Sequence, residues 1–392
     1  MIKKIKLQNF RSIENAEIEI APLTIFYGPA GSGKSSVLYS LIVLKNFVSN
    51  PAQRADGFFD LGFMHLGSFK ECVFNHDLER EIGLYFSLDF PNEYGISLRQ
   101  TSARIFLDSR FARMEANVSL PYYLTESFAF TIESPEGIFE VKWNGITSTV
   151  APAMPTAENQ QKGVEISKEL NQIPEYLKKI DIAPHRRGFF KPSYSPIPIT
   201  PNPISEDELS TIIMNDPAIE AKVSLDLEKM LGKEFRKHIP PGTAMAAFYI
   251  TDKSSRITTL LVNEGYGVNQ IVYMLAKIHR PEIRTILIEE PEVHLHPSAI
   301  CALVRTFCSI VKEEGKQIIL TTHSETFVSS VLAAVRRKEL TPQDVKCYLV
   351  EKEKKASLFR EQKVTEDGQI EGGLSSFIEA ELEELRVFFE KI

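Results

Sequence analysis

A glycine-rich segment near the start of the chain has the residue types and the spacing of a phosphate-binding loop. It fills every position of the pattern G-x-x-x-x-G-K-[ST] and is followed by one more serine: Gly28, Pro29, Ala30, Gly31, Ser32, Gly33, Lys34, Ser35 and Ser36. In such a loop backbone N–H groups form a nest for phosphate oxygens, the lysine reaches the outer phosphates, and the serine hydroxyl binds Mg²⁺. An apolar strand over residues 23–27 precedes the loop and a helical pattern follows it. The segment therefore predicts a nucleotide site, with Lys34 as a catalytic residue and Ser35 as a metal ligand.

Two carboxylates end an apolar strand in the last third of the chain. Residues 285–288 lead directly into Glu289 and Glu290. One carboxylate at such a strand end suits contact with Mg²⁺, and the next can orient or deprotonate a water in line with the γ-phosphate of ATP. We expect Glu289 to be the metal-side group and Glu290 the catalytic one.

A second apolar strand, residues 317–321, leads into Thr322, His323 and Ser324. A histidine after a strand is more often structural than catalytic. Beside a strand that ends in two carboxylates, we expect His323 to contact the γ-phosphate or the attacking water.

A turn with Gly265 and Gly267 opens a further helical pattern. The N-terminus of a helix attracts anions, and this one cannot serve the chain's own phosphate loop, which already has a helix. Its natural target is the γ-phosphate held by a second copy. The turn thus predicts a homodimer that encloses ATP between two chains.

These motifs resemble those of the ABC-type ATPase heads of the SMC and RecF kind, and within that group the ATPase module of the overcoming-lysogenization-defect (OLD) type. Residues 5–13 look like the L-x-N-F-R-S strand that begins such heads, in which the arginine, here Arg11, lies near the nucleotide phosphates. Residues 289–297 are similar to the Walker B motif and D-loop of OLD-like members, residues 265–270 to their degenerate signature motif, and residues 322–324 to their H-loop. The resemblance implies ATP and Mg²⁺ as cofactors, and a role in DNA repair, genome maintenance or defence against foreign DNA.

The chain departs from the family pattern at several positions. Ala30 lies in a loop where many relatives have Asn, Glu289 stands where most ABC proteins have Asp, and the serine of the LSGGQ signature has no clear counterpart, with Asn263 as the candidate. No Q-loop glutamine is identified; residues 66–72 occupy about that region.

OLD-type nucleases continue past the H-loop into a Toprim domain with an acidic cluster. Only about seventy residues follow Ser324 here, and their acidic residues are scattered among lysines. We expect no metal-dependent nuclease site in this chain and assign any nuclease to a separate effector protein.

The predicted fold is an α/β P-loop NTPase of the ABC-head type, with a mixed sheet around the phosphate-loop helix, an antiparallel β lobe and a helical lobe. Alternating residues at 81–90, 127–133 and 139–143 predict antiparallel strands. We divide the chain into an N-terminal half of the head (1–147), a Pro-rich insertion in place of a coiled coil (148–217) and a C-terminal half (218–392). The insertion is expected to hold one short helix around residues 170–180, and residues 374–389 a packing helix.

The amino-acid composition restricts which molecules the chain is expected to bind. The net charge of −7 argues against a globally basic nucleic-acid coat, although a local patch can coexist with it. His185, Arg186 and Arg187 beside two phenylalanines could bind a phosphate or a nucleic acid, but an arginine pair that is solvated or bridged to acidic neighbours is the more common explanation. His294 and His296 lack a third metal ligand and fit a D-loop at a dimer interface better.

We expect no membrane span and no signal peptide, and the cysteines, which lack C-x-x-C spacing, suit a reducing compartment, so the predicted location is the cytoplasm. Two alternatives remain open for the function. One is a slow ATP-dependent switch or scaffold for an effector. The other is a transporter motor subunit, which the missing Q-loop and LSGGQ motif disfavour.

Overall fold

The structure is a computed structural model that describes residues 1–88, 92–122, 127–200 and 203–373, and the chain forms two compact units. Unit 1 contains Met1–Ile20, Ser36–Asp181 and Lys354–Ala356, and unit 2 contains Ala21–Ser35, Ile182–Glu353 and the described residues that follow Ala356. The units therefore alternate along the sequence. The division at residues 147 and 217 stays a prediction, and the expected helix at 374–389 lies outside the described residues.

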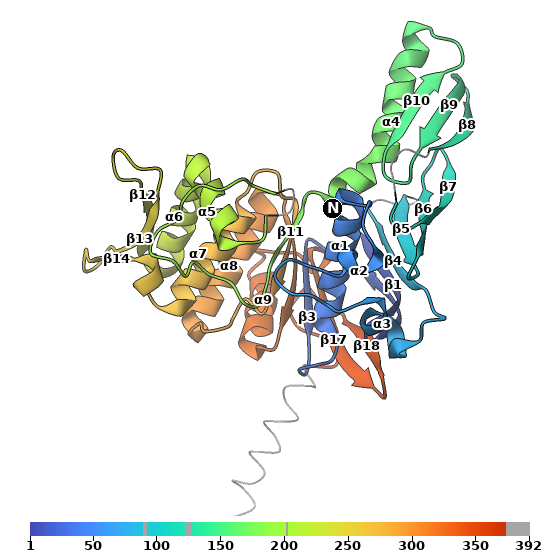
Figure 1. Cartoon of the computed structure of the whole chain (residues 1–392). Helices are drawn as coiled ribbons and strands as arrows, with labels where there is room; N and C mark the ends of the chain where they lie inside the picture. Colours follow the sequence, from blue (N-terminus) through green and yellow to red (C-terminus); the bar gives the residue numbers. More distant parts are fainter. Residues whose placement is uncertain (89–91, 123–126, 201–202, 374–392) are drawn as a thin grey trace, which may run out of the picture. The chain divides into compact units, whose positions relative to one another are not determined.

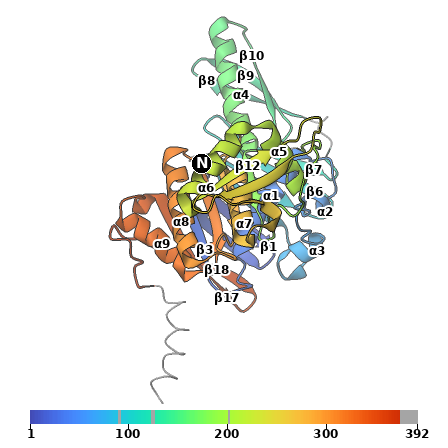
Figure 2. The ribbon, with the colours of Figure 1, turned by 90° about the vertical axis from the view of Figure 1, so that its left-hand side faces the viewer.

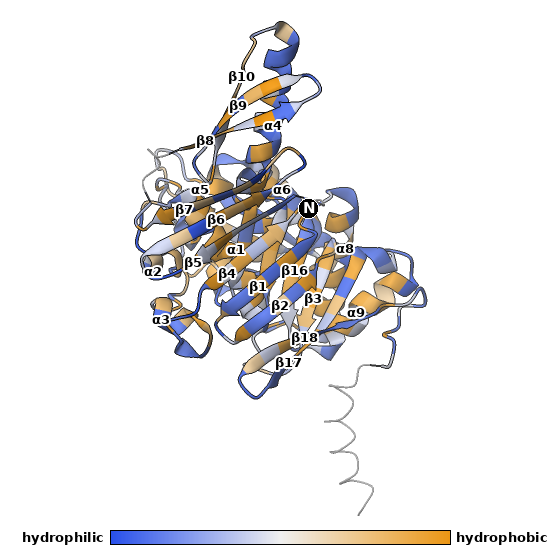
Figure 3. Ribbon diagram, turned by 90° about the vertical axis from the view of Figure 1, so that its right-hand side faces the viewer, coloured by the Kyte–Doolittle hydropathy of each residue, from blue (hydrophilic) through white to orange (hydrophobic). Residues whose placement is uncertain are grey.

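Unit 1 is built on a six-stranded antiparallel sheet. Exposed and buried residues alternate along its edge strand β7, and the alternation of polar and apolar colours in Figure 3 follows the same pattern. The strands in spatial order are β2 (Ile13–Glu19), β1 (Lys4–Phe10), β4 (Ile82–Ser87), β5 (Glu93–Leu98), β6 (Ser102–Asp108) and β7 (Arg113–Ser119). Its helices before β4 are α1 (Lys34–Ser49, which begins in unit 2), α2 (Ala55–Phe58), α3 (Phe69–Cys72) and η1 (Phe74–His76).

A smaller sheet of unit 1 consists of β8 (Phe128–Ser134), β9 (Gly137–Trp143) and β10 (Ser148–Pro152). Helix α4 (Ala157–Leu177) lies along β10, as Figures 1 and 2 show. With 21 residues it is much longer than the short helix expected around 170–180. Thr156 caps its first turn by accepting from the Asn159 N–H, and an apolar face with Ile166, Leu170 and Ile173 is buried, so packing keeps Pro174 inside the helix.

Unit 2 is built on a second six-stranded sheet, and its central strands are parallel. All residues of β3, β15 and β16 are buried, as expected for strands that are covered on both faces. Glu289 is paired with Thr321, and Thr321 with Phe26, so the three strands end at the same edge. The strands in spatial order are β11 (Ile180–Ala183), β15 (Thr285–Glu289), β16 (Gln317–Thr322), β3 (Leu23–Tyr27), β17 (Val345–Glu353) and β18 (Ala356–Gln362).

The remaining elements of unit 2 pack around this sheet, where α7 contacts β15 and α8 contacts β16. A three-stranded antiparallel sheet lies against α6. The elements are α5 (Glu206–Asn215), α6 (Pro217–Leu231), β12 (Lys233–His238), β13 (Ala247–Asp252), β14 (Thr258–Leu260), η2 (Leu261–Asn263), α7 (Tyr266–Ile278), α8 (Pro297–Glu313), α9 (Glu325–Arg336) and η3 (Pro342–Asp344). Among the described helices, none combines the length and the apolar character needed to cross a membrane.

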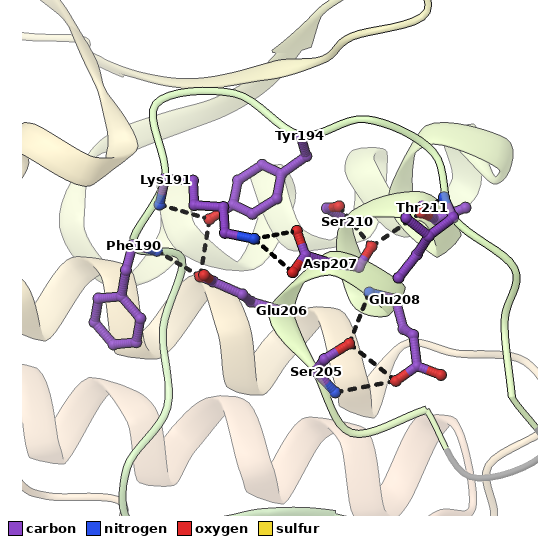
Figure 4. A network of polar contacts seen from close by, with 10 residues as sticks. Phe190, Lys191, Tyr194, Ser205, Glu206, Asp207, Glu208, Ser210 and Thr211 are labelled. Atoms are coloured by element: carbon purple, nitrogen blue, oxygen red, sulfur yellow. Dashed lines mark hydrogen bonds and ion pairs between the residues drawn. The ribbon is translucent and has the colours of Figure 1, made fainter.

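The proline-rich segment before α5 is held by one carboxylate. Glu208 accepts from the N–H and hydroxyl of Thr200 and from the N–H and hydroxyl of Ser205, at 2.5–3.2 Å. Figure 4 shows its contacts with Ser205 at the start of α5. Burial alone would raise the pKa of Glu208, but these hydrogen bonds outweigh it and lower the pKa to about 2.

Candidate functional site

The phosphate loop joins β3 to α1, and glycine is required at its first position. Gly28 has φ 137°, and a Cβ there would lie 2.3 Å from the Val350 carbonyl oxygen. The Lys34 ammonium group folds back over the loop and donates to the carbonyls of Gly28 (3.0 Å) and Pro29 (2.8 Å). Burial lowers the pKa of Lys34 to about 8, although the charges of Glu290 and Glu292 act in the opposite direction. The ammonium group is thus still charged at neutral pH.

The two candidate carboxylates follow one another at the end of β15. Glu289 is buried, and its Oε2 accepts from the backbone N–H of His185 at 3.1 Å. Glu290 adopts the left-handed region, with φ 43°, and its N–H donates to the Thr321 carbonyl at 2.9 Å. The change of backbone direction sends the two neighbouring side chains to different partners.

The Glu290 carboxylate lies between two imidazoles. Its Oε1 is 3.1 Å from His323 Nε2, and its Oε2 is 3.1 Å from His185 Nδ1. The structure therefore brings together Glu290 and His323, which the sequence singled out on separate strands, and adds His185 from the end of β11.

Glu292 supports the loop that carries His323. Its Oε1 accepts from the Thr322 hydroxyl (2.7 Å) and from the His323 N–H (2.9 Å). These contacts join the segment after β15 to the segment after β16, and so fix the backbone on which the imidazole stands.

Three buried polar atoms at this edge have no hydrogen-bond partner: Ser32 Oγ in the phosphate loop, Thr321 Oγ1 in β16 and Glu292 Oε2 after β15. Such atoms are uncommon inside proteins. They fit a polar ligand such as a nucleotide phosphate with its hydrated cation.

The donor set also fits Mg²⁺. This ion takes oxygen ligands and is commonly held by one or two protein groups together with phosphates and waters. Ser35 and Glu289 would supply the protein oxygens. Within the described part of the chain, no group of three or more His, Cys, Asp or Glu residues could hold a metal ion. His294 and His296 therefore belong to no such group.

The signature-like turn begins α7. Gly265 is its N-cap, and Gly267 lies so close to the D-loop that a Cβ would be 2.7 Å from the His294 carbonyl oxygen. The Tyr266 ring contacts the His294 ring edge-on (4.8 Å) and stacks on Phe190 (6.0 Å). Asn263, at the end of η2, and Gly265 are exposed. Their contact with the nucleotide of a second chain stays a prediction.

Arg11 and Ser36 belong to unit 1. The Arg11 N–H donates to the Cys72 carbonyl (2.6 Å), and its guanidinium lies 5.6 Å from the centre of the Tyr39 ring. Ser36 is buried in the first turn of α1. Their roles in nucleotide binding stay predictions.

The hypothesis that Arg187 belongs to a nucleic-acid surface is wrong. Only 2% of this residue is exposed, because its guanidinium donates to the carbonyls of Pro184 (2.8 Å), Glu289 (2.5 Å) and Glu290 (2.8 Å). Arg186, next to it, is exposed. The basic triplet follows the short strand Ile180–Ala183 after one proline, but this pattern does not distinguish a buried arginine at a strand end from an exposed basic patch.

A phosphate loop between a buried parallel strand and a helix, with paired carboxylates at the end of a nearby strand of the same sheet, defines a P-loop nucleotide hydrolase. The predicted α/β fold class is thereby confirmed. Residues 1–113 and 136–328 match the AAA ATPase domain family, and the chain belongs to this family and is an ATPase.

The relatives agree with this assignment and with the predicted resemblance to OLD-type modules, which is confirmed. The OLD nuclease of Thermus scotoductus (strain ATCC 700910 / SA-01) is 24% identical over 382 residues, which cover 91% of this chain and 66% of the nuclease. The chain thus spans about two thirds of the length of that relative. An ATP/GTP phosphatase of Helicobacter pylori (strain ATCC 700392 / 26695) is 20% identical over 366 residues, covering 88% of this chain and 90% of the phosphatase.

Solved structures with a similar chain course include the SMC head domain from Thermotoga maritima, with 12% identity, a TM-score of 0.45 and coverage of 93% of this chain and 99% of that one. Another is the Smc head domain with an extended coiled coil bound to the C-terminal domain of ScpA, from Pyrococcus furiosus, with 11% identity, a TM-score of 0.48 and coverage of 98% and 99%.

Proposed function

We propose that the chain hydrolyses ATP in composite sites that form when two copies dimerise around the nucleotide. The observation that carries this proposal is the arrangement of Glu290, whose carboxylate is held by His323 and His185 at the strand edge that also carries the phosphate loop. A carboxylate in this place can orient and deprotonate a water that attacks the γ-phosphate.

The residues that one chain contributes to its own nucleotide site form the cis half of the composite site, and each has a separate role. Lys34 leaves the loop carbonyls and binds the outer phosphates, and the N–H groups of residues 31–35 cradle them. Ser35 and Glu289 would hold Mg²⁺, which when bound neutralises charge on the phosphates. Glu290 takes the proton of the attacking water, and His323 donates to the γ-phosphate or orients that water.

The second copy of the chain contributes the other part of the composite site, its trans half, which is the turn Gly265–Gly267. Gly265 is exposed at the N-terminus of α7, where backbone N–H groups and the helix dipole attract an anion. Two such turns in a twofold dimer would complete two sites. ATP would then hold the chains together until hydrolysis removes the γ-phosphate, so Glu290 would set the lifetime of the dimer.

The mass of the Glu290→Gln variant in solution, measured by light scattering with Mg²⁺ and with or without ATP, tests the proposal. The substitution keeps the shape of the site and blocks hydrolysis, so we expect a monomer that becomes a dimer only with ATP. Glu353→Gln, at an exposed position, is the matched control and should hydrolyse ATP like the wild type. An unchanged mass of Glu290→Gln with ATP demonstrably bound would contradict the composite site.

For the biological setting we propose DNA repair, genome maintenance or defence in the cytoplasm, with DNA or a separate nuclease as partner. The similarity to an OLD nuclease over most of this chain supports this choice. Stimulation of ATP turnover by double-stranded DNA, lost at high salt, would support a DNA partner. Turnover that is insensitive to DNA at low salt would favour a protein partner.

A slow ATP-dependent switch is the second candidate, and one observation favours it. Both oxygens of Glu290 already contact imidazoles, which leaves each oxygen one lone pair and restricts where an attacking water can bind. Stable ATP-dependent dimers of the wild type, with turnover too slow to detect, would support the switch.

A further inference from the structure

The backbone at Glu290 is held in an unfavourable conformation. A φ of 43° is disfavoured for a residue with a side chain and persists only where surrounding contacts enforce it. Three hydrogen bonds do so here: the Glu290 N–H donates to the Thr321 carbonyl (2.9 Å), and the Glu290 carbonyl accepts from Arg187 Nη2 (2.8 Å) and, less closely, from the Val293 N–H (3.3 Å). The direction of the carboxylate therefore depends on Arg187.

Arg187 binds the ends of two strands with one planar group. Nη1 donates to the carbonyls of Glu289 and Pro184, while Nη2 donates to the carbonyl of Glu290 and lies 3.4 Å from Gln270 Oε1. Burial lowers its pKa to about 10, so the group remains charged at neutral pH. An ammonium group lacks this fixed fork of donors and cannot replace all of these contacts.

The segment that carries Arg187 is itself fixed from two helices. The Asn269 side chain in α7 accepts from the Phe189 N–H and donates to the Phe189 carbonyl, both at 2.8 Å. On the other side, the Phe190 N–H donates to Glu206 Oε2 in α5 (2.5 Å), which also accepts from the Tyr194 hydroxyl (2.9 Å), as Figure 4 shows. None of these contacts involves the phosphate loop.

We propose that the segment His185–Phe190 positions Glu290 for ATP hydrolysis, with Arg187 fixing its backbone and His185 its side chain. Neither residue need touch the nucleotide, so both act through Glu290 as positioning residues. Asn269 and Gln270 lie in the helix that Gly265 begins, and one hydrogen-bonded network thus connects the signature-like turn with the catalytic carboxylates of the same chain. This inference rests on the proposed role of Glu290 but does not require dimerisation.

Arg187→Lys tests the backbone contact, with Arg186→Lys as the matched control on the exposed neighbour. The kcat and the KM for ATP are measured with Mg²⁺, together with the affinity for a fluorescent ATP analogue and a melting curve. A displaced carboxylate should lower kcat roughly 10²-fold while KM and nucleotide affinity stay at wild-type values. Arg186→Lys should match the wild type in all of them. Wild-type kcat in Arg187→Lys, or a loss of nucleotide affinity parallel to that of kcat, would overturn the proposal.

His185→Ala keeps the proposal testable if Arg187→Lys does not fold, because the His185 side chain is 57% exposed and its removal leaves the interior intact. We expect a lower kcat with unchanged KM; an unchanged or raised kcat would refute positioning by this segment. Glu290→Gln is measured beside these variants. If it retains turnover, the proposed role of Glu290 has failed. If it abolishes turnover while Arg187→Lys and His185→Ala keep theirs, only the positioning inference has failed.

Discussion

Replacing Glu314 by Gln should destabilise unit 2 in a pH-dependent way, because Glu314 belongs to a buried ion cluster at the end of α7. The cluster centres on His279, whose side chain is only 2% exposed. Its Nε2 lies 2.7 Å from Asp226 Oδ2, and its Nδ1 lies 3.3 Å from Glu314 Oε1, within ion-pair distance but without hydrogen-bond alignment.

The two carboxylates decide the charge of the imidazole. Burial acts to lower the pKa of His279, but the contacts with Asp226 and Glu314 outweigh it and raise that pKa above its ordinary 6.5. Contact with His279 in turn, together with the ammonium groups of Lys222 (3.1 Å away) and Lys316, lowers the pKa of Glu314 from 4.5 to about 2. The lowering of the Glu314 pKa corresponds to about 3 kcal/mol of stability. The contact between the two side chains contributes to both changes, so they are not added.

The directions of the two pKa shifts define the pH range in which Glu314 and His279 stabilise the folded chain. The Glu314 pKa is lowered in the folded chain, so its contribution is present above pH 4.5 and is lost as the pH falls towards 2. The His279 pKa is raised, so its contribution is complete below pH 6.5 and is lost as the pH rises through the folded value. Glu314→Gln should therefore cost most between these two values, with a melting temperature lower by about 6 to 12 °C.

Urea unfolding followed by circular dichroism, at a series of pH values from 4 to 9, measures this effect. Glu313→Gln is the matched control, since the neighbouring carboxylate is exposed and carries the same charge. The difference between wild type and Glu314→Gln should shrink as the pH rises above the folded pKa of His279. An equal loss at every pH, a loss that grows in alkali, or the same loss in Glu313→Gln would refute the reasoning.

Three further substitutions test the site. Gly265→Ala should change the free energy of unfolding by no more than about 1 kcal/mol, because φ is −53° and no atom lies within 4 Å of the new Cβ. The same substitution should weaken ATP-dependent dimerisation, measured by light scattering. Normal dimers would argue against a contact between this turn and the nucleotide of the second chain. Gly28→Ala should abolish ATP binding in a fluorescence titration, since its Cβ would overlap the Val350 carbonyl, and wild-type affinity would show that the loop does not bind in this form. Glu292→Gln should lower kcat and leave the KM for ATP unchanged, since the charge that holds the His323 N–H is lost; unchanged kcat would mean that the hydrogen bonds alone suffice.

The placement of the candidate site residues at strand ends was predictable from sequence because its signals are local. The phosphate loop, Glu289, Glu290 and His323 each follow a short apolar run, and parallel strands bring the ends of such runs together. The resemblance to OLD-type modules depends on the same short motifs.

The role of Arg187 was not predictable in this way. Its partners are backbone carbonyls of Glu289 and Glu290, which carry no residue-specific signal, and they lie about one hundred residues away in sequence. An arginine beside aromatic residues has the same sequence pattern whether it is buried or exposed. The length of α4 was not predictable for a related reason, since its polar first half has no continuous apolar face and is stabilised by the Thr156 cap and by packing of α4 on β10.

The in-register pairing of the central strands fixes how many residues of β15 separate its first residue from Glu289. At its start, the Thr285 hydroxyl donates to Gln317 Oε1 (3.0 Å), and Gln317 Nε2 donates to the Ala21 carbonyl (3.1 Å), which ties β15 to β16 and to the residues before β3. From this anchor five residues lead to Glu289. Since side chains alternate between the faces of a strand, a single deletion there would move Glu290 into the position of Glu289, and Glu289 into the position of Ile288, which faces the other side of the sheet. Insertions and deletions in homologous chains should therefore avoid residues 285–290, however much the loops between β12, β13 and β14 vary in length.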